Sequence, residues 1–453
     1  MDRPLRIAVF VGSFPVVSET FILRQITGLC DLRHEVDIYA DTRGGSLAHP
    51  EVQNYRLLER TTFMDMPPEV VPWEMPILPI TGRTWIPGET RSRSNLGRAA
   101  RALPVFLKCL AKHPRLTINV LRPDEYGFQA DSLSVLYRLH RLIKKPQGYD
   151  VLHAHFGPNG NSFRFARELW KAPLVVSFHG YDFTTVPRKQ GAGVYQKLFQ
   201  TADVITVNSE FSRSRILNLG VPVSKLHKLP VGLNPELFPY RDRILKPGET
   251  VRILSIGRLV SIKGHEFAIE AIAKLRQQHP NIHYSIVGEG PQGQSLGQLI
   301  KERNLSDHVT LCGALTGPAF KKMIDDAHLF LMPSVSIQGD AEGQGLVMQE
   351  AQCAGLPVIA TNHGALPEGM LPERSGFLVP ERDIQSLCDR LGYLVEHPAI
   401  WPTLGRAGRE FVAGLYDIRE LNLELVALYE QAVMKYNDSK DVKPFQLPPP
   451  NCA

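Results

Sequence analysis

The sequence predicts an α/β protein with two Rossmann-like domains, each built on a parallel sheet, that face a central cleft. Short apolar runs rich in β-branched residues alternate with longer helical patterns through most of the chain. The succession of strand, glycine turn and helix starts again at residues 251–257, after a stretch dense in turn-forming residues. The 453 residues exceed one ordinary core and suit two domains of roughly 200 residues each.

In the first half, two predicted helices are each opened by a serine that can cap the free N–H groups of the first turn. These helices span residues 18–30 and 209–219. A proline-rich stretch, 67–87, interrupts the pattern and is interpreted as an inserted loop. Strands are predicted at 7–11, 35–39, 150–154, 174–178 and 204–207. Residues 6–12 are too short for a secretory signal and are interpreted as the first core strand.

The second half repeats this organisation. Its strands are predicted to begin at residue 251 and to recur at 282–287, 309–312, 328–332 and 357–361. The turn formers of 230–239 and 246–248 place the boundary between the halves, because such residues end regular elements. We therefore predict domains at 1–235 and 236–420, a C-terminal helix at 421–436 and a disordered tail at 437–453.

Composition excludes several classes of protein. No apolar run approaches the ~20 residues that a membrane-spanning helix needs, and we expect a cytoplasmic protein. No C-x-x-C pair occurs, which argues against a disulfide framework and a zinc ribbon. The six cysteines are Cys30, Cys109, Cys312, Cys353, Cys388 and Cys452.

The net charge is only +5, but its distribution is uneven. Residues 83–122 hold nine Lys or Arg residues and one acid, Glu89, and the part from 96 to 110 has a helical pattern with one apolar side. A basic amphipathic segment of this kind can lie on an anionic membrane surface. The alternative is a solvated basic helix face. Nucleic-acid binding is not expected, since no recognition motif accompanies the charge.

Two glutamates, Glu342 and Glu350, flank a glycine-rich turn that leads into an apolar segment. Free N–H groups at a helix N-terminus can bind a phosphate or diphosphate. Carboxylates beside an anion site are explained if the ligand also carries hydroxyls, because an ionised carboxylate accepts two such donors. A nucleotide sugar has all of these parts. The alternative is an ordinary loop and helix with solvated glutamates.

A basic pair occurs in the first loop of the second half, where Arg258 follows a predicted strand and Lys263 lies five positions later. A guanidinium and an ammonium at a strand end would neutralise a diphosphate, the leaving group whose charge grows during glycosyl transfer. The basic pair and the glutamate segment lie in the same predicted domain.

Together these residues resemble the retaining glycosyltransferases of family 4, which have a GT-B fold. The similarity extends over nearly the whole chain, and its positions are Gly12, Gly232, 257–259, 287–291, 332–334, the E-x7-E pair and 357–361. The blocks at 18–22, 155–158 and 179–182 are most similar to the colanic acid and amylovoran branch of bacterial exopolysaccharide transferases.

The resemblance implies roles for individual residues. Arg258 and Lys263 would hold the donor diphosphate, Glu350 would bind the ribose hydroxyls, and Glu342 would face the donor sugar. The backbone N–H groups beside the phosphates would be those of Gly343, Gln344, Gly345 and Leu346, and the loop with Gly288 and Glu289 would border the base. From the first domain, His179 would reach the transferred sugar, while Gly12, Ser13 and Glu19 would border a saccharide or lipid-linked saccharide acceptor.

Two residues depart from the family pattern. Related proteins often carry Phe where this chain has Gln344, and a second glycine where it has Ser13. Neither the UDP or GDP identity of the donor nor the sugar follows from the sequence.

The resemblance implies a front-face substitution in which the departing diphosphate helps to remove the acceptor proton. No enzyme nucleophile or general base is then assigned, and His179, Glu342, Arg258 and Lys263 stabilise and position the transition state. A metal is not expected, since no D-x-D motif occurs. His153 and His155 share a strand face and could ligate a metal only if other ligands, such as Asp150, His179 or Asp182, approach in space.

Four other functions are compatible with parts of the sequence. A glycosidase would use Glu342 and Glu350 as acid and nucleophile, but their position beside a phosphate turn argues against it. A dehydrogenase is suggested by the G-x-G-x-x-G of 288–293, but no acid follows the next strand. A GT-B-fold epimerase would convert donor without acceptor. A non-catalytic sensor would bind the nucleotide sugar without turnover.

Overall fold

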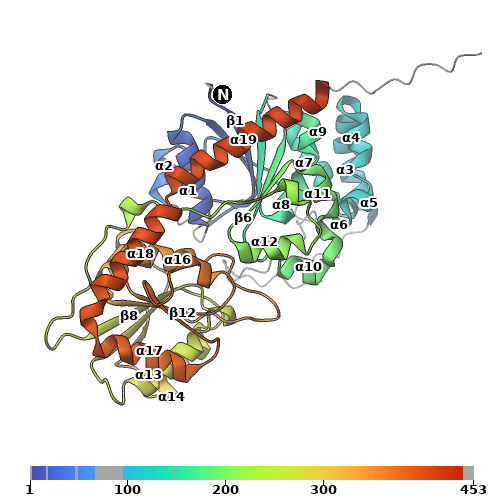
Figure 1. Cartoon of the computed structure of the whole chain (residues 1–453). Helices are drawn as coiled ribbons and strands as arrows, with labels where there is room; N and C mark the ends of the chain where they lie inside the picture. Colours follow the sequence, from blue (N-terminus) through green and yellow to red (C-terminus); the bar gives the residue numbers. More distant parts are fainter. Residues whose placement is uncertain (1–2, 17–18, 46–48, 67–94, 146–147, 442–453) are drawn as a thin grey trace, which may run out of the picture.

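The computed structural model describes residues 3–16, 19–45, 49–66, 95–145 and 148–441. These residues form two parallel sheets of seven and six strands, each covered by helices and each in its own lobe (Figure 1). The two-domain α/β fold predicted from the sequence is confirmed.

The first sheet has the strand order β3-β2-β1-β4-β5-β6-β7, and all of its pairs are parallel. Its central strands β4 and β5 are buried along their whole length, as expected for a sheet covered on both faces. The strands are β1 (Arg6–Phe14), β2 (Glu35–Arg43), β3 (Thr61–Phe63), β4 (Val151–His155), β5 (Leu174–Phe178), β6 (Val204–Val207) and β7 (Leu226–Lys228).

One correction concerns the start of the chain. The first strand was predicted to end at residue 11 or 12, but β1 also includes Ser13 and Phe14 and pairs with β2 as far as Phe14 and Arg43. The strand continues because β2 is equally long, and the Ser13 and Thr42 hydroxyls add a hydrogen bond of 2.7 Å between the two strands.

The second sheet has the order β10-β9-β8-β11-β12-β13, again all parallel. Every strand predicted in this half is present, and β13 is an additional edge strand. The bounds are β8 (Val251–Ile256), β9 (Ile282–Val287), β10 (Val309–Leu311), β11 (Leu329–Met332), β12 (Val358–Thr361) and β13 (Gly376–Val379).

The helices of the first lobe include both that were predicted. The cap of α12 is as expected, because the Ser209 side chain accepts the N–H of Ser212. Helix α1 begins at Thr20, and the expected cap Ser18 lies outside the described residues, as does the proline-rich stretch 67–87. The helices are α1 (Thr20–Asp31), α2 (Pro50–Asn54), α3 (Asn95–Lys112), α4 (Pro114–Asn119), α5 (Pro123–Tyr126), α6 (Phe128–Asp131), α7 (Ser134–Leu142), α8 (Gly157–Phe163), α9 (Ala166–Trp170), α10 (Thr185–Gln190), α11 (Gln196–Thr201) and α12 (Glu210–Leu217).

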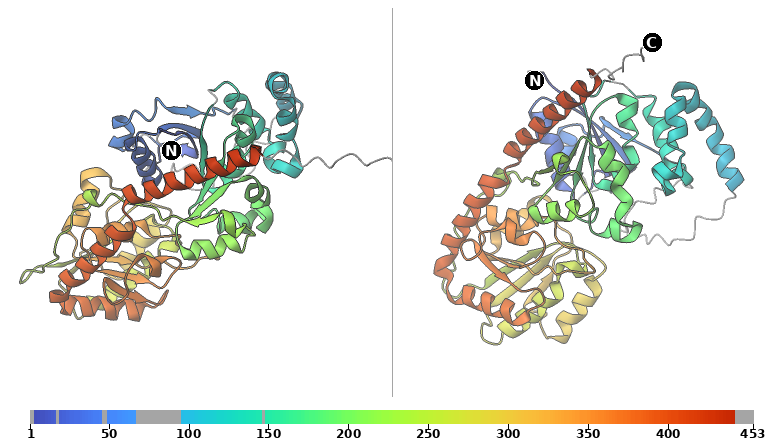
Figure 2. Two further views of the ribbon diagram at one scale, coloured as in Figure 1. Left: turned by 45° about the horizontal axis from the view of Figure 1, so that its top comes forward. Right: turned by 45° about the vertical axis from the view of Figure 1, so that its right-hand side comes forward.

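The last helix returns to the first lobe. Figures 1 and 2 show α19 leaving the second lobe and running along the first sheet. Its apolar residues Leu421, Leu425 and Tyr429 belong to the same core as α1 and β1. The helices that follow β8 are α13 (His265–Leu275), α14 (Gly293–Glu302), α15 (Gly317–Asp326), α16 (Leu346–Cys353), α17 (Ile384–Glu396), α18 (Trp401–Leu415) and α19 (Ile418–Asp441).

This helix corrects the sequence prediction at both of its ends. A helix was predicted at 421–436 and a disordered tail from 437, but α19 spans Ile418–Asp441. It begins earlier because the backbone of Ile418 donates to Leu233 in the connection between the sheets, at 2.9 Å. Residues 442–453 lie outside the described residues.

No helix among the described residues is long and apolar enough to cross a membrane.

Candidate active site

The glycine-rich turn of the second lobe packs directly against the strand ends of the first. The Ser209 hydroxyl at the start of α12 donates to the Gly343 carbonyl at 2.8 Å. A Cβ added to Gly343 would lie 2.4 Å from the backbone oxygen of His179, so only glycine fits this contact. The E-x7-E turn and His179, predicted in different domains, therefore meet in the structure.

Glu342 is held by groups of its own lobe. Its Oε1 accepts from Lys263 Nζ at 2.7 Å and from the Ser334 hydroxyl at 3.0 Å. Burial favours the neutral acid, but Lys263 outweighs it and holds the pKa of Glu342 below its usual value. Glu342 is therefore an ionised carboxylate in an ion pair.

A partly buried hydrogen-bond network supports the main chain at Glu342. The backbone N–H of Glu342 donates to His363 Nε2 at 3.1 Å, and the other ring nitrogen, Nδ1, lies 2.9 Å from Glu381 Oε1. Glu381 also accepts from the backbone N–H of Ser336 at 2.6 Å. His363 and Glu381, which the sequence analysis did not single out, thus fix the main chain at Glu342.

Glu350 depends on the opposite lobe. It lies in α16 with 5% of its side chain exposed, and its Oε1 accepts from Arg24 Nη1 of α1 at 2.8 Å. The Arg24 guanidinium also packs on the Phe238 ring, 5.7 Å from its centroid. Sequence reasoning missed Arg24, because nothing near it in the chain indicates a partner 326 positions away.

Gln344, the departure from the family pattern, joins the turn to the connection between the sheets. Its side-chain amide donates to the Val231 carbonyl and accepts the Val231 N–H, both at 2.7 Å, and it also donates to Gln349 at 2.7 Å. Gly345 follows with a φ of 84°, and Leu346 begins α16, so the predicted helix N-terminus is present.

The other predicted donor residues gather at the carboxyl ends of β8 and β9. Arg258 is exposed in the loop after β8, and Lys263 ends a short 3₁₀ turn. The backbone of Leu259 donates to the Glu289 carbonyl at 2.9 Å, which joins this loop to Gly288 and Glu289. The basic pair and the glycine loop therefore share one end of the second sheet, where parallel α/β sheets bind ligands.

His179 follows β5 in the first lobe. Its Nε2 lies 3.1 Å from His155 Nδ1, and its ring centroid lies 4.7 Å from that of Phe21 and 4.8 Å from that of Phe156. Burial lowers the pKa of His179 to about 3, so the imidazole is neutral at ordinary pH. It can orient a hydroxyl but does not supply a positive charge.

Asp182 holds the loop that carries this histidine. Its carboxylate accepts the N–H groups of His179 at 3.1 Å, Gly180 at 2.8 Å and Gly157 at 3.2 Å. Burial nevertheless raises the pKa of Asp182 to about 6. Asp182 was considered in the sequence only as a metal ligand, and its observed contacts are to the backbone.

The residues expected at the acceptor lie on β1 and at the start of α1. Ser13 and Glu19 line a small pocket with Phe14 and Ile22. Gly12 precedes Ser13 in the strand, and its carbonyl accepts from the Thr42 hydroxyl at 3.4 Å. Burial raises the pKa of Glu19 to about 7.

Both ring nitrogens of His153, which was considered as a metal ligand, form hydrogen bonds within the protein. Its Nδ1 lies 2.6 Å from the Tyr429 hydroxyl of α19 and its Nε2 lies 2.7 Å from the Ser177 hydroxyl. Both nitrogens are therefore used in packing the last helix on the first sheet. Within the described ranges, no group of three or more His, Cys, Asp or Glu side chains could hold a metal ion.

Comparisons with known proteins identify the family and the fold. The glycosyl transferase 4-like domain matches residues 18–232, and the domain of glycosyl transferases group 1 matches residues 239–411. Among solved structures, an Anabaena protein in complex with UDP and glucose covers 94% of this chain, and the chain covers all of it, with a TM-score of 0.66 and 15% identity. The two-sheet architecture is thus the GT-B fold.

The chain belongs to glycosyltransferase family 4. It is 30% identical to a protein of Salmonella typhimurium named as a colanic acid biosynthesis glycosyltransferase, over 94% of this chain and 100% of the relative. It is also 30% identical to the amylovoran biosynthesis glycosyltransferase of Erwinia amylovora, over 84% of this chain and 89% of that one. The chain is therefore a glycosyltransferase related to enzymes of exopolysaccharide biosynthesis, in a family whose members are retaining.

Proposed function

We propose that this chain transfers a hexose, without a metal, from a nucleoside-diphosphate sugar to a saccharide or lipid-linked saccharide during bacterial exopolysaccharide or cell-surface polysaccharide biosynthesis. The observation that carries the proposal is the contact between Gly343 and the His179 backbone, which brings the turn that follows the Lys263–Glu342 pair against the His179 loop of the opposite lobe. A donor sugar bound there would touch both lobes at once.

The second lobe would hold the donor. Arg258 and Lys263 neutralise the diphosphate, and the N–H groups of Gly343, Gln344, Gly345 and Leu346 lie beside it at the start of α16. Glu350 accepts the ribose hydroxyls once it is released from Arg24. Gly288 and Glu289 border the base.

The transfer itself needs no covalent enzyme intermediate. The bond between the anomeric carbon and the diphosphate oxygen breaks, and the acceptor hydroxyl oxygen bonds to the same carbon on the same face. The departing diphosphate takes the acceptor proton. Arg258 and Lys263 stabilise its growing charge, while His179 and Glu342 position the sugar.

The acceptor would enter along the first lobe. Gly12, Ser13 and Glu19 border it, on the β1 and α1 side of the cleft. A neutral Glu19 carboxyl could donate a hydrogen bond as well as accept one, which suits a sugar hydroxyl.

The edge of the first lobe supports a peripheral position on the cytoplasmic face of a membrane. No acidic residue occurs between positions 95 and 119. Leu103 and Leu107 of α3 are each 53% exposed, and Lys108 and Lys112 of the same helix are exposed beside them. Figure 2 shows α3 and α4 at the end of the lobe that lies away from the second lobe. Exposed leucines among lysines suit an anionic lipid surface.

Vesicle flotation tests this surface. The chain should float with phosphatidylglycerol vesicles and not with phosphatidylcholine vesicles, and Lys108→Glu with Lys112→Glu should abolish flotation. The matched control is Lys301→Glu with Lys321→Glu, which makes the same charge change in the second lobe. Equal loss in both double variants would mean that net charge, rather than α3, directs binding.

A nucleotide panel followed by a transfer assay tests the enzymatic proposal. UDP, GDP, ADP and CMP are compared by thermal shift, and a ligand at a hundred times its dissociation constant stabilises by about 2.7 kcal/mol. Transfer from the matching nucleotide sugar to a lipid-linked saccharide extract should persist in EDTA. Donor conversion without acceptor would indicate an epimerase, binding without turnover a sensor, and restoration by divalent ions a metal-dependent enzyme.

A further inference from the structure

The main chain of Glu342 is held on both sides by the turn that follows β12. The Glu342 N–H donates to His363 Nε2 at 3.1 Å, and the Glu342 carbonyl accepts the N–H of Ala365 at 3.0 Å. Between these contacts, Gly364 has a φ of 53°, and a Cβ there would lie 2.5 Å from the Glu342 carbonyl oxygen. The turn 363–365 therefore fits closely against this one residue.

Two hydrogen bonds determine which ring nitrogen of His363 carries the proton. A backbone N–H can only donate, so Nε2, which receives the Glu342 N–H, carries no proton. The proton of His363 is then on Nδ1, which lies 2.9 Å from Glu381 Oε1. The His363 side chain is fully buried. Because the ring is removed from water, both of its nitrogens depend on partners within the protein.

The Glu381 carboxylate is the acceptor that this tautomer requires. Burial favours the neutral acid, but the Ser336 N–H, at 2.6 Å, and the His363 ring outweigh it and hold the pKa of Glu381 below its usual value. The Ser336 hydroxyl also donates to Glu381, at 2.8 Å. An ionised carboxylate only accepts, so it must receive the proton of His363 Nδ1. Glu381 and the Glu342 N–H thus require the same tautomer.

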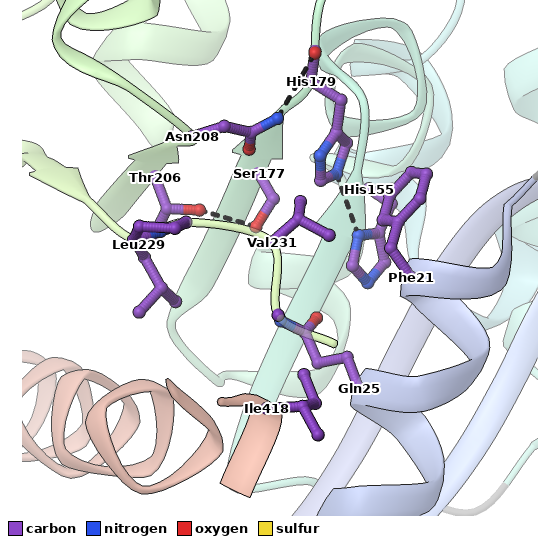
Figure 3. Close-up of a pocket in the computed structure, with 12 residues that line it drawn as sticks. Phe21, Gln25, His155, Ser177, His179, Thr206, Asn208, Leu229, Val231 and Ile418 are labelled. Carbon is purple, nitrogen blue, oxygen red and sulfur yellow. Dashed lines mark hydrogen bonds between the residues drawn. The ribbon is translucent and has the colours of Figure 1, made fainter. Parts of the chain in front are cut away.

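The placement of Glu342 affects both sides of the cleft. Its carboxylate is paired with Lys263, and the next residue, Gly343, packs against the main chain of His179. Figure 3 shows this part of the first lobe, where the Asn208 side chain donates to the His179 carbonyl at 3.3 Å. A shift of the Glu342 main chain would move the carboxylate and the contact between the lobes together. A misplacement of about 1 Å can lower a rate about 10²-fold.

We propose that His363 and Glu381 are positioning residues for glycosyl transfer: the Glu381 carboxylate keeps the His363 proton on Nδ1, and His363 Nε2 holds the Glu342 main chain so that the Glu342 carboxylate stays at the transferred sugar. In this role neither residue touches the substrate. The effect on transfer rests on the proposed function of Glu342, whereas the tautomer is a property of the free protein.

Long-range ¹H–¹⁵N correlation spectra of the full chain labelled at histidine test the tautomer with no ligand added. His363 should show a protonated Nδ1 and an unprotonated Nε2, and its signals are assigned by their absence in His363→Gln. A protonated Nε2 in the native chain would overturn the proposal, because that nitrogen could not accept the Glu342 N–H.

Kinetics of His363 variants test the consequence for transfer. His363→Leu removes the acceptor of the Glu342 N–H and should lower kcat about tenfold or more, while the affinity for the nucleotide found in the panel stays within about twofold. His363→Gln should recover part of kcat, since its side-chain oxygen can accept this N–H. Equal kcat in the Leu and Gln variants, or a parallel loss of nucleotide affinity, would contradict the positioning role.

Glu381 variants test the second positioning residue. Glu381→Leu should also lower kcat, whereas Glu381→Gln should lower it less, because the Gln oxygen can still accept from His363 Nδ1. The same kcat in Glu381→Leu and the native chain would show that Glu381 has no positioning role.

His279 and Glu396 provide a matched control. Their side chains form another histidine–glutamate contact of the second lobe, at 3.3 Å. His279 follows α13, at the end of that helix opposite to Lys263. His279→Leu should therefore leave kcat and nucleotide affinity unchanged. A loss equal to that of His363→Leu would mean that removing any such contact lowers activity, and it would overturn the specific role of His363.

A double-mutant cycle shows whether His363 acts through Glu342. In a chain that already carries Glu342→Ala, His363→Leu should lower kcat no further, because the carboxylate that it positions is absent. A further loss of about tenfold in this background would overturn the proposal. If Glu342→Ala alone leaves kcat unchanged, the proposed function of Glu342 fails and the positioning role fails with it, whereas the spectra still decide the tautomer of His363.

Discussion

Glu342 and Glu350 are eight positions apart in one turn and helix, yet they are held in opposite ways. Glu342 has its cation, Lys263, and its backbone support, His363, in its own lobe. Glu350 has its cation, Arg24, in the other lobe. The geometry at Glu342 is thus built into one sheet, whereas the pairing of Glu350 depends on how the two lobes are placed.

Other hydrogen bonds of the second lobe also depend on how the two lobes are placed. The Glu368 carboxylate accepts the N–H groups of Glu210 and Phe211 at the start of α12, each at 2.7 Å. The Gln344 amide pairs with Val231. These contacts hold the lobes together. The Arg24–Glu350 ion pair is a further contact of this kind, and a donor that binds Glu350 must displace Arg24.

The largest effect is expected at Glu342. Glu342→Ala should lower transfer by about 10²–10³, because it removes a preorganised group at the sugar, while the affinity for nucleotide changes little. The measurement is kcat for transfer together with calorimetric nucleotide binding. Glu373→Ala, which removes a 63% exposed glutamate from the same lobe, is the control. Equal losses of binding and transfer would place Glu342 at the nucleotide instead.

A smaller effect is expected at Glu350. Glu350→Ala should weaken nucleotide binding about tenfold to a hundredfold, since hydrogen bonds to a charged group contribute about 1.5–3 kcal/mol. Titration calorimetry with UDP and GDP measures this change. Equal affinity in the native chain and the variant would remove the ribose assignment.

A third carboxylate, Glu19, differs from Glu342 in the direction of its pKa shift, and this difference predicts a pH dependence of stability. Burial raises its pKa to about 7, whereas the pKa of Glu342 is lowered. The unfolded chain loses the Glu19 proton above pH 4.5, whereas the folded chain keeps it until about pH 7. The contribution of the protonated Glu19 to the free energy of unfolding is therefore lost as the pH rises toward 7. Between pH 5 and 8 the loss is on the order of 2 kcal/mol.

Urea unfolding at these two pH values measures the Glu19 contribution. The fall in stability should be smaller in Glu19→Gln, which cannot ionise. A variant that follows the same pH curve as the native chain would show that Glu19 does not titrate in this range.

The smallest effect is expected at Arg24, and its sign is the most informative. Arg24→Met should strengthen nucleotide binding several-fold, because Glu350 would no longer have to exchange a guanidinium for ribose; about 1 kcal/mol corresponds to fivefold. Arg56→Met, at a residue that is 75% exposed on the same lobe, is the control. Weaker binding in Arg24→Met would mean that Arg24 contacts the donor itself.

Regular elements were the most predictable part of this molecule. The buried strands β4 and β5 and the capped helix α12 carry their signals in a few neighbouring residues, and each was found as predicted. The edge strands β3 and β7 were not predicted, since they have three residues each and only part of each strand is buried. The packing of α19 on the first lobe was not predicted, because an apolar stripe indicates that a helix is partly buried but not which surface it packs against.

At the candidate site, the residue types were predictable and their partners were not. Arg258, Lys263 and the E-x7-E turn stand at strand and helix ends that periodicity and glycine spacing indicate. The contact between His155 and His179 carries no such signal, because His155 ends β4 whereas His179 follows β5.

The sequence by itself determined the two parallel sheets, the glycine turn at the start of α16 and the charged groups near it, because these follow from preferences acting over a few residues. The tertiary structure decided that Glu342 is paired within its lobe, that Glu350 is paired with Arg24 and that His155 lies behind His179. The physical reason is burial. A charge or an imidazole removed from water must find a partner, and which partner it finds depends on the faces that the folded chain brings together.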